Sequence, residues 1–159
     1  MTHDKALREQ LIYLLKGGGA HADFNTAIAD VPVAMRGKTP KGAEHSLWEI
    51  LEHIRIAQWD ILEFSRNSEH KSPEWPAGYW PATKAPPNRT AWSRSVKACQ
   101  ADLEAMCELV SHPTTNLYER LPHGEGQTIL REALLLADHH AYHLGALVLV
   151  RRLLGVWKK

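Results

Sequence analysis

The chain has 159 residues and a mass of 17.9 kDa, which suffices for one hydrophobic core and is too short for two. Apolar residues make up 44% and charged residues 23% of the sequence, which argues against a disordered or fibrous chain. A net charge of +1 gives no reason to expect a nucleic acid or an anionic membrane as a partner. We therefore expect a single domain over residues 1–159.

Neither the N-terminus nor the cysteines indicate export. No apolar stretch typical of a secretory signal follows Met1–Lys5, and the longest apolar run, Leu144–Val150, has seven residues where a transmembrane helix needs roughly 20. Cys99 and Cys107 are eight positions apart on an expected helix, about 12 Å, which is too far for a disulfide. We expect reduced thiols, a cytoplasmic location and no membrane-spanning segment.

Hydrophobic spacing is helical along the chain, and no segment shows the alternation of a half-buried strand. The first helix is expected over Lys5–Lys16, where the glycines Gly17–Gly19 end it. A further short helix is predicted over Ala20–Ala29, so that the N-terminal helical region is divided. The prolines and glycines of Asp30–Ala43 predict a loop.

The second long helix has a clear start. Ser46, followed three residues later by Glu49, forms the pattern of a capping box, and the helical spacing behind it continues to Ser65. Residues 66–88 then contain five prolines, which predicts a long irregular connection of a kind that is often functional in a small domain. Its aromatic residues either fold over a site as a lid or plug one end of the core: Trp75, Tyr79 and Trp80.

Two more long helices complete the expected fold. One runs over Arg89–Ser111 and is capped by Asn88 or Thr90, and the other runs over Thr128–Leu154 and stops at Gly155. The last helix is apolar on most sides, which predicts that it is buried and that some of its surface pairs with another chain. Three long helices and a divided N-terminal one predict an all-α protein, an antiparallel four-helix bundle.

Histidine is unusually frequent, with ten in the chain. His139 and His143 are four apart on the last helix, so their Cβ atoms lie roughly 5–6 Å apart on one face and both rings can reach one ion. His53 lies about 60° from Ile50 and about 40° from Ala57 around the second long helix. This position turns His53 toward the buried side of the helix or its border.

A buried imidazole without a partner costs on the order of 1–3 kcal/mol, and a shared divalent cation satisfies all three rings. Three histidine ligands leave at least one coordination position open for water or substrate, as in a reactive metal site. Glu49, four before His53, and Glu132, seven before His139, are candidates to bind the ring nitrogens that face away from the ion. The alternative is that each ring meets a carbonyl or a carboxylate and the histidines are structural.

The other histidines give weaker indications. His140 is turned by about 100° from His139 and is expected to be a core or interface histidine. His21 and His45 lie in or beside loops at one end of the bundle, where they either reach the mouth of the site or face solvent. Four more are expected to be solvated: His3, His70, His112 and His123.

Two motifs together resemble those of the DinB-like (damage-inducible protein B) superfamily: Glu52-His53, with Trp48 nearby, and His139-x-x-x-His143-Leu144-Gly145. The resemblance implies a four-helix bundle, often homodimeric, that holds one divalent metal ion between its second and last long helices. His53, His139 and His143 occupy the matching ligand positions. Relatives in that superfamily include thiol-dependent S-transferases and a maleylpyruvate isomerase, and many other members have no established reaction.

From these observations we expect a metal-dependent enzyme of the thiol-dependent transferase or hydrolase type, with one zinc or nickel ion as cofactor. The substrate is expected to be a small molecule, with a low-molecular-weight thiol as the leading candidate, and no residue is identified as the general base. The alternatives are a non-catalytic metal-binding or small-ligand-binding protein of the stress response, and a dimerising scaffold. We expect a homodimer and no partnership with nucleic acid or membrane.

Overall fold

The segments with helical periodicity form helices in the computed structural model, which describes residues 3–157. No β-strand is present among these residues, which confirms the all-α prediction; one isolated antiparallel bridge joins Arg120 and Thr128. The helices are α1 (His3–Lys16), α2 (Phe24–Ile28), α3 (Leu47–Arg66), α4 (Ala91–Ser111) and α5 (Ile129–Leu153), with short 3₁₀ helices η1 (Val33–Met35) and η2 (Ala77–Tyr79).

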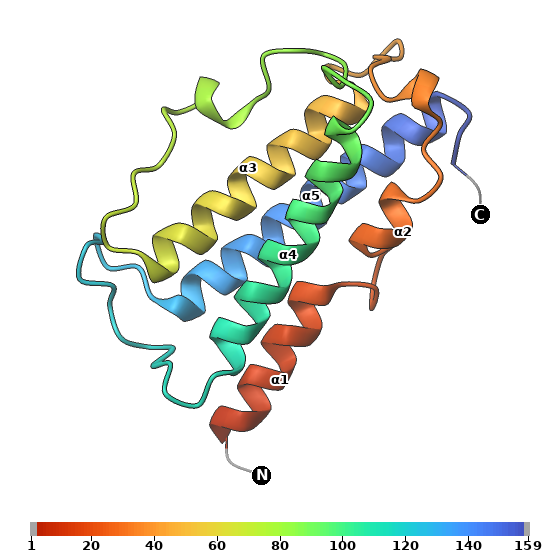
Figure 1. Ribbon diagram of the computed structural model, residues 1–159. Coiled ribbons are helices and arrows are strands. Elements are labelled where there is room, and N and C mark those ends of the chain that lie inside the picture. The colour runs from red at the N-terminus through yellow and green to blue at the C-terminus, as the bar shows by residue number, and fades with distance from the viewer. Residues whose placement is uncertain (1–2, 158–159) are drawn as a thin grey trace.

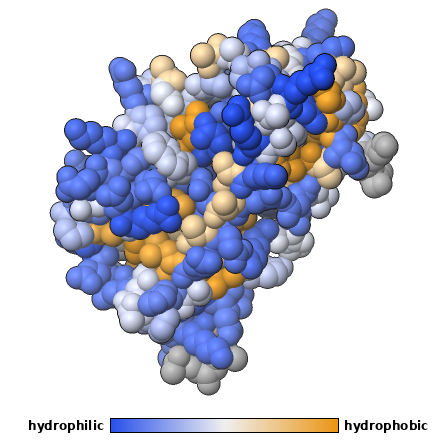
Figure 2. Space-filling view, in the orientation of Figure 1, coloured by the Kyte–Doolittle hydropathy of each residue, from blue (hydrophilic) through white to orange (hydrophobic). Residues whose placement is uncertain are grey.

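The four long helices form a bundle in which α3 packs on both α4 and α5, and α1 packs against α4 and α5 (Figure 1). The connection from α3 crosses the length of the bundle before α4 begins, so α3 and α4 run in the same direction and α5 runs opposite to both (Figure 1). The bundle is therefore antiparallel across the α3–α5 contact, where the two candidate metal-binding motifs lie. The face shown in Figure 2 is largely hydrophilic, with its apolar residues in separate patches.

The N-terminal helical region is divided, as predicted, but its second part is shorter. Gly17 and Gly18 adopt φ of +68° and +85°, a conformation that ends α1 and suits glycine. The short helix spans five residues and not the whole of Ala20–Ala29, because Asp23 is its N-cap and accepts a hydrogen bond from the Thr26 amide at 2.7 Å.

The starts of α3, α4 and α5 follow from local side-chain bonds. The capping box is confirmed: the Ser46 amide donates to Glu49 at 2.8 Å, and the Glu49 amide donates to the Ser46 hydroxyl at 3.2 Å. At α5, the Thr128 hydroxyl accepts from the Arg131 amide at 3.1 Å. Thr90 is the N-cap of α4, and Asn88 supports it by accepting from the Thr90 amide at 3.1 Å.

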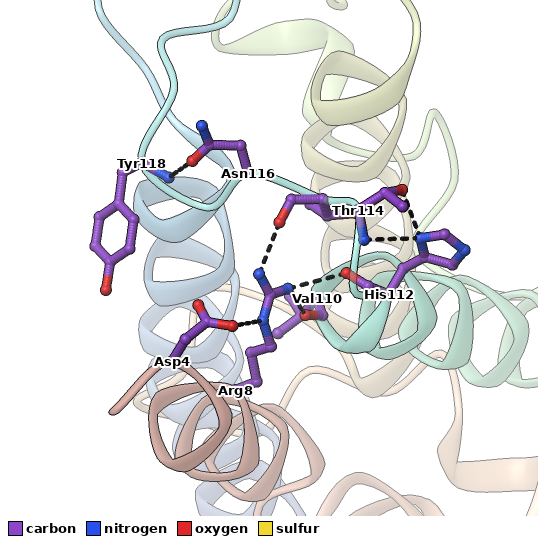
Figure 3. A network of polar contacts seen from close by, with 8 residues as sticks. Asp4, Arg8, Val110, His112, Thr114, Asn116 and Tyr118 are labelled. Atoms are coloured by element: carbon purple, nitrogen blue, oxygen red, sulfur yellow. Dashed lines mark hydrogen bonds and ion pairs between the residues drawn. The ribbon is translucent and has the colours of Figure 1, made fainter. Parts of the chain in front are cut away.

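The half-buried side chain of Arg8 fastens α1 to the end of α4 (Figure 3). The Arg8 guanidinium donates to the carbonyls of Val110 at 2.6 Å, His112 at 3.1 Å and Thr115 at 2.7 Å, and it pairs with Asp4 at 2.7 Å. The last carbonyls of a helix have no partner within the helix, so a guanidinium placed there both satisfies them and fixes the packing of α1.

The apolar interior falls into two clusters along the bundle. In α3 the first cluster uses residues 47–54 and the second residues 61 and 62, and in α5 the order is reversed. Gln58 lies between the two clusters on α3, and its amide donates to the Cys99 carbonyl at 2.6 Å. His139 and His143 lie between the clusters on α5, while His53 lies on α3 among the residues of the first cluster.

Within the described residues, α5 is the one helix long and apolar enough, by length and composition, to cross a membrane. The central helix of a bundle has the same properties, and α5 packs against α1, α2, α3 and α4 with Glu132 and Arg151 buried. These contacts account for the buried apolar residues of α5, while others on the same helix are exposed, among them Leu135 and Leu149. The expectation that the chain has no membrane-spanning segment stays a prediction.

Candidate metal centre

Three histidine rings from two helices meet where α3 packs on α5. His53 projects from α3, and His139 and His143 project from consecutive turns of α5. The His53 Nε2 atom lies 3.1 Å from His143 Nε2 and 3.1 Å from His139 Nε2. One possible ligand atom from each ring lies within 4.8 Å of the others. The structure thus brings together all three residues that the sequence singled out.

The spacing of these nitrogens fits one ion. Metal–nitrogen bonds of about 2.05 Å place two nitrogens about 3.3 Å apart at a tetrahedral angle and about 2.9 Å apart at a right angle. The observed separation of 3.1 Å falls between these two values. Three such ligands on one side of an ion leave the opposite side open.

His53 is held in the tautomer that a metal ligand needs. Its Nδ1 lies 2.9 Å from the carbonyl oxygen of Tyr79. A carbonyl can only accept, so Nδ1 carries the proton and the neutral ring presents a lone pair at Nε2. The Tyr79 carbonyl therefore aims the coordinating atom of His53 at the two rings on α5.

The two rings on α5 lack this kind of support. His139 Nδ1 is buried and has no hydrogen-bond partner. Glu132 does not supply one, because its carboxylate pairs with Arg131 at 2.6 Å, and Glu49 is used in the capping box. Neither candidate carboxylate therefore stands behind a ligand ring, and Glu49 has the capping role that its position after Ser46 predicts.

All three rings are neutral at pH 7. Burial, and then the neighbouring imidazoles, lower the pKa of His139 to about 4 and that of His143 to about 3. Burial lowers the pKa of His53 as well, while the Tyr79 carbonyl opposes the shift. Only the neutral ring has a lone pair to offer, so the site is ready to bind a cation without first releasing protons.

The connection between α3 and α4 covers one side of the centre. The Trp80 indole stacks on the His53 ring with centroids 4.1 Å apart, and on the His45 ring at 3.9 Å. Trp75 instead is 75% exposed and meets the edge of Tyr79. Tyr79 and Trp80 thus cover the site, as expected for a lid. Trp75 neither covers the site nor plugs the end of the core.

Among the histidines outside the cluster, His70 and His123 differ from their expected solvated surroundings. His140 is buried and stacks on Phe24, as predicted for a core histidine, whereas His21 is exposed. His70 is not solvated, because its ring is buried and donates to Asp60 at 2.8 Å. His123 is half-buried against Phe64. His45 stacks on Trp80 and so lies beside the centre, which is the first of the two positions expected for it.

The two cysteines play no part in the centre. Both are buried as free thiols, as expected. Burial raises the pKa of Cys99 and that of Cys107, which keeps both thiols protonated and unreactive. Nucleophilic chemistry at this site therefore has no cysteine of the described chain to rely on.

One of three comparisons with known proteins found a match. A family model described as the DinB superfamily matches residues 19–147, a range that contains all three clustered histidines. The comparisons with curated proteins and with solved structures gave no match.

Proposed function

Because this chain belongs to the DinB superfamily, we propose that it binds one divalent metal ion through His53, His139 and His143 and uses that ion to act on a small molecule. The observation that carries the proposal is the approach of three imidazole rings to one point, with His53 Nε2 3.1 Å from the Nε2 atoms of both His139 and His143. Imidazole rings that face each other at this distance are well suited to share a cation.

The donor set favours zinc or nickel as the ion. Imidazole nitrogen is a good ligand for both, and neither hard carboxylates nor soft thiolates belong to the cluster. Three neutral ligands leave the full positive charge on the ion. We therefore expect a strongly polarising centre with one side free for water or substrate.

A divalent ion in such a site lowers the pKa of a bound water or thiol and so generates a nucleophile near neutral pH. Residues around the three histidines orient and shield the ligand rings. Tyr79 orients His53, Trp80 shields one face of that ring from water, and His45 lies at the rim beside Glu49 at 3.9 Å. This supports a thiol-dependent transferase or hydrolase acting on a small substrate, with a low-molecular-weight thiol as the co-substrate.

The apolar stripe on α5 supports a homodimer. Leu135, Tyr142 and Leu149 recur every seven residues, and all three are exposed. A stripe of this kind on a helix is suited to packing against a second copy of the chain. A homodimeric scaffold remains the alternative to an enzyme, and light scattering of the purified protein measures its mass directly.

We retain the cytoplasmic location, and the absence of a nucleic-acid partner, as expectations from the cysteines and the charge.

Metal content is the test of this proposal. Protein purified without a histidine tag should hold close to one equivalent of divalent ion by elemental analysis, and His143→Ala should hold almost none. His21→Ala, which removes an exposed loop histidine, is the matched control and should keep its metal. Metal content in His143→Ala equal to that of the wild type would remove the proposal.

Turnover separates the enzyme from a binding protein or scaffold. The stripped and the zinc-reloaded proteins should be assayed side by side with a panel of thiols and electrophiles. An activity that appears only in the reloaded protein, and is missing from His143→Ala, supports the enzyme. Metal binding without any such activity supports the non-catalytic stress protein.

A further inference from the structure

A second cluster of polar groups joins α3, the helix of His53, to the connection between α3 and α4. Asp60 is 8% exposed, and the side chain of His70 is 6% exposed. One carboxylate oxygen of Asp60 accepts from His70 Nε2 at 2.8 Å, and the other accepts from the Tyr79 hydroxyl at 2.6 Å. A carboxylate is costly to bury, so both of its oxygens need such donors. The metal-binding role described above does not use this carboxylate.

Tyr79 joins this cluster to the metal centre. Its hydroxyl binds Asp60, and its main-chain carbonyl accepts from His53 Nδ1 at 2.9 Å. His53 and Asp60 are seven residues apart on α3, about 10.5 Å along the helix axis, so Tyr79 spans two helical turns and is fixed at both ends. Burial, and then the bond to Asp60, raise the pKa of Tyr79 to about 12, so the hydroxyl keeps its proton and donates.

The position of the Tyr79 carbonyl decides which nitrogen of His53 is free. A neutral imidazole carries its proton on either Nδ1 or Nε2, and the acceptor it meets selects between the two. With the carbonyl in place, the proton stays on Nδ1 and Nε2 faces the rings on α5. If the carbonyl moves away, the tautomer with the proton on Nε2 becomes accessible, and that tautomer cannot bind a metal there.

The carbonyl belongs to an irregular segment, so something outside that segment must hold it. Tyr79 is the last residue of η2, a single turn closed by a bond from its own amide to the Pro76 carbonyl at 3.2 Å. A short 3₁₀ turn has little stability of its own. The Asp60 carboxylate supplies the long-range anchor, and His70, from the start of the same segment, supplies a second tie to it.

We propose that Asp60 is a positioning residue of the metal centre, which acts through Tyr79 to keep the coordinating nitrogen of His53 free. The proposal rests on the proposed function, since it concerns affinity for the ion that the three histidines hold. It assigns a role to a carboxylate that touches none of the ligand rings. It also makes the connection between α3 and α4 a part of the centre.

Two conservative variants test the link. Tyr79→Phe removes the hydroxyl but keeps the ring and the main-chain carbonyl, and Asp60→Asn keeps the shape of the carboxylate without its charge. The Zn²⁺ dissociation constant, measured by competition with a chromogenic chelator, should rise about tenfold in each. The Zn²⁺ dissociation constant of the double variant should not exceed the larger of the two single-variant values, because both changes break the same link.

Matched controls distinguish this link from a general loss of a carboxylate or a phenol. Glu63→Gln removes a carboxylate of α3 that pairs with Arg66, and Tyr118→Phe removes a hydroxyl from a ring that is 61% exposed. Both should bind Zn²⁺ within about twofold of the wild type, because neither group touches the centre.

A second readout follows the tautomer itself. In metal-free protein labelled with ¹⁵N-histidine, two-bond nitrogen–proton correlations should place the proton of His53 on Nδ1, with the signal assigned by its loss in His53→Gln. In Tyr79→Phe and Asp60→Asn a growing fraction of that proton should appear on Nε2. A merely structural role would lower the melting temperature and leave the tautomer unchanged.

The outcomes separate this inference from the proposed function. Wild-type Zn²⁺ affinity and an unchanged His53 tautomer in Tyr79→Phe would overturn the positioning role while His143→Ala still loses its metal. Undiminished Zn²⁺ binding in His143→Ala would overturn the function itself. Should Asp60→Asn fail to fold by circular dichroism, Tyr79→Phe decides, since the removed hydroxyl lies at the far end of the side chain from the carbonyl.

Discussion

The two sides of the metal centre are built differently. On α3, His53 is fixed by the Tyr79 carbonyl at one nitrogen and covered by the Trp80 ring. On α5, His139 has a buried Nδ1 without a partner, and His143 meets the edge of Tyr142, a ring that is 75% exposed. One ligand is therefore oriented before any ion arrives, while the other two depend on the packing of their helix and on the ion.

The proposed cation would therefore meet one ring oriented by a carbonyl and two rings placed by helical spacing. Helical spacing alone places two rings on one face of α5, and it requires no further residues to do so. The single ring on α3 has no such neighbour, and an irregular segment supplies its orientation. We expect changes on the α3 side to alter affinity through orientation, and changes around the α5 rings to alter it little unless a ligand is removed.

Removal of the proposed ion should have the largest effect, because that ion would bind ligands on both helices. Free zinc at about a thousand times its dissociation constant stabilises the folded state by about 4 kcal/mol. For a protein of this size, that corresponds to a rise in melting temperature of roughly 8–16 °C. Calorimetry of stripped and reloaded protein measures the difference, and equal melting temperatures would contradict a bound ion.

Acid should destabilise the metal-free protein through the α5 side. The folded-state pKa values of His139 and His143, about 4 and about 3, lie below the value of about 6.5 expected in the unfolded chain. The unfolded state thus binds more protons between these limits, and stability falls as the pH drops from about 6.5 toward 3.

Urea unfolding of stripped protein at several pH values tests this expectation. The midpoint should fall steadily below about pH 6.5, and His139→Gln, which cannot titrate, should show a shallower fall. His21→Gln serves as the control on an exposed loop and should follow the wild type. A fall in His139→Gln as steep as in the wild type would show that another group governs acid unfolding.

Loss of the cover on the α3 side should have a moderate effect. Trp80→Ala removes the ring that stacks on His53 and opens that face to water, so we expect zinc to leave about tenfold faster. Stopped-flow transfer of zinc to an excess of chelator measures this rate. Trp75→Ala removes an exposed tryptophan of the same segment and should release zinc at close to the wild-type rate. Equal rates in the two variants would show that the stacking is incidental.

The smallest effect is expected beside His143. Tyr142→Phe keeps the edge-on ring contact, with centroids 4.9 Å apart, and removes a hydroxyl from an exposed side chain. Zinc affinity should change by less than about twofold, since this ring does not determine which nitrogen of His143 is free. Chelator competition measures the affinity, and a tenfold loss would mean that the α5 side is also braced from outside its helix.

The sequence was sufficient for the parts of the centre that depend on helical periodicity. The spacing of His139 and His143 predicted a shared face, and the angle of His53 from Ile50 predicted its inward direction, because each follows from the geometry of one helix. The capping pair at the start of α3 fixed where that helix begins. These are local properties, so they can be read from neighbouring positions.

The remaining parts depend on contacts between distant segments. Nothing periodic marks residues 67–90, so the approach of Tyr79 to His53, or of His70 to Asp60, could not be inferred from spacing. The common direction of α3 and α4 depends on the path of the same segment (Figure 1). One signal was available: Asp60 lies seven residues after His53, on the same face of α3, where an acidic residue needs a buried donor.

X-ray absorption at the zinc edge tests the central claim most directly. Zinc-loaded wild-type protein should show three imidazole nitrogens at about 2.0–2.1 Å, with oxygen scatterers completing the shell. His53→Gln, His139→Gln and His143→Gln should each show one imidazole fewer or no bound zinc. An unchanged imidazole count in any one of these variants would contradict a single ion shared by the three rings.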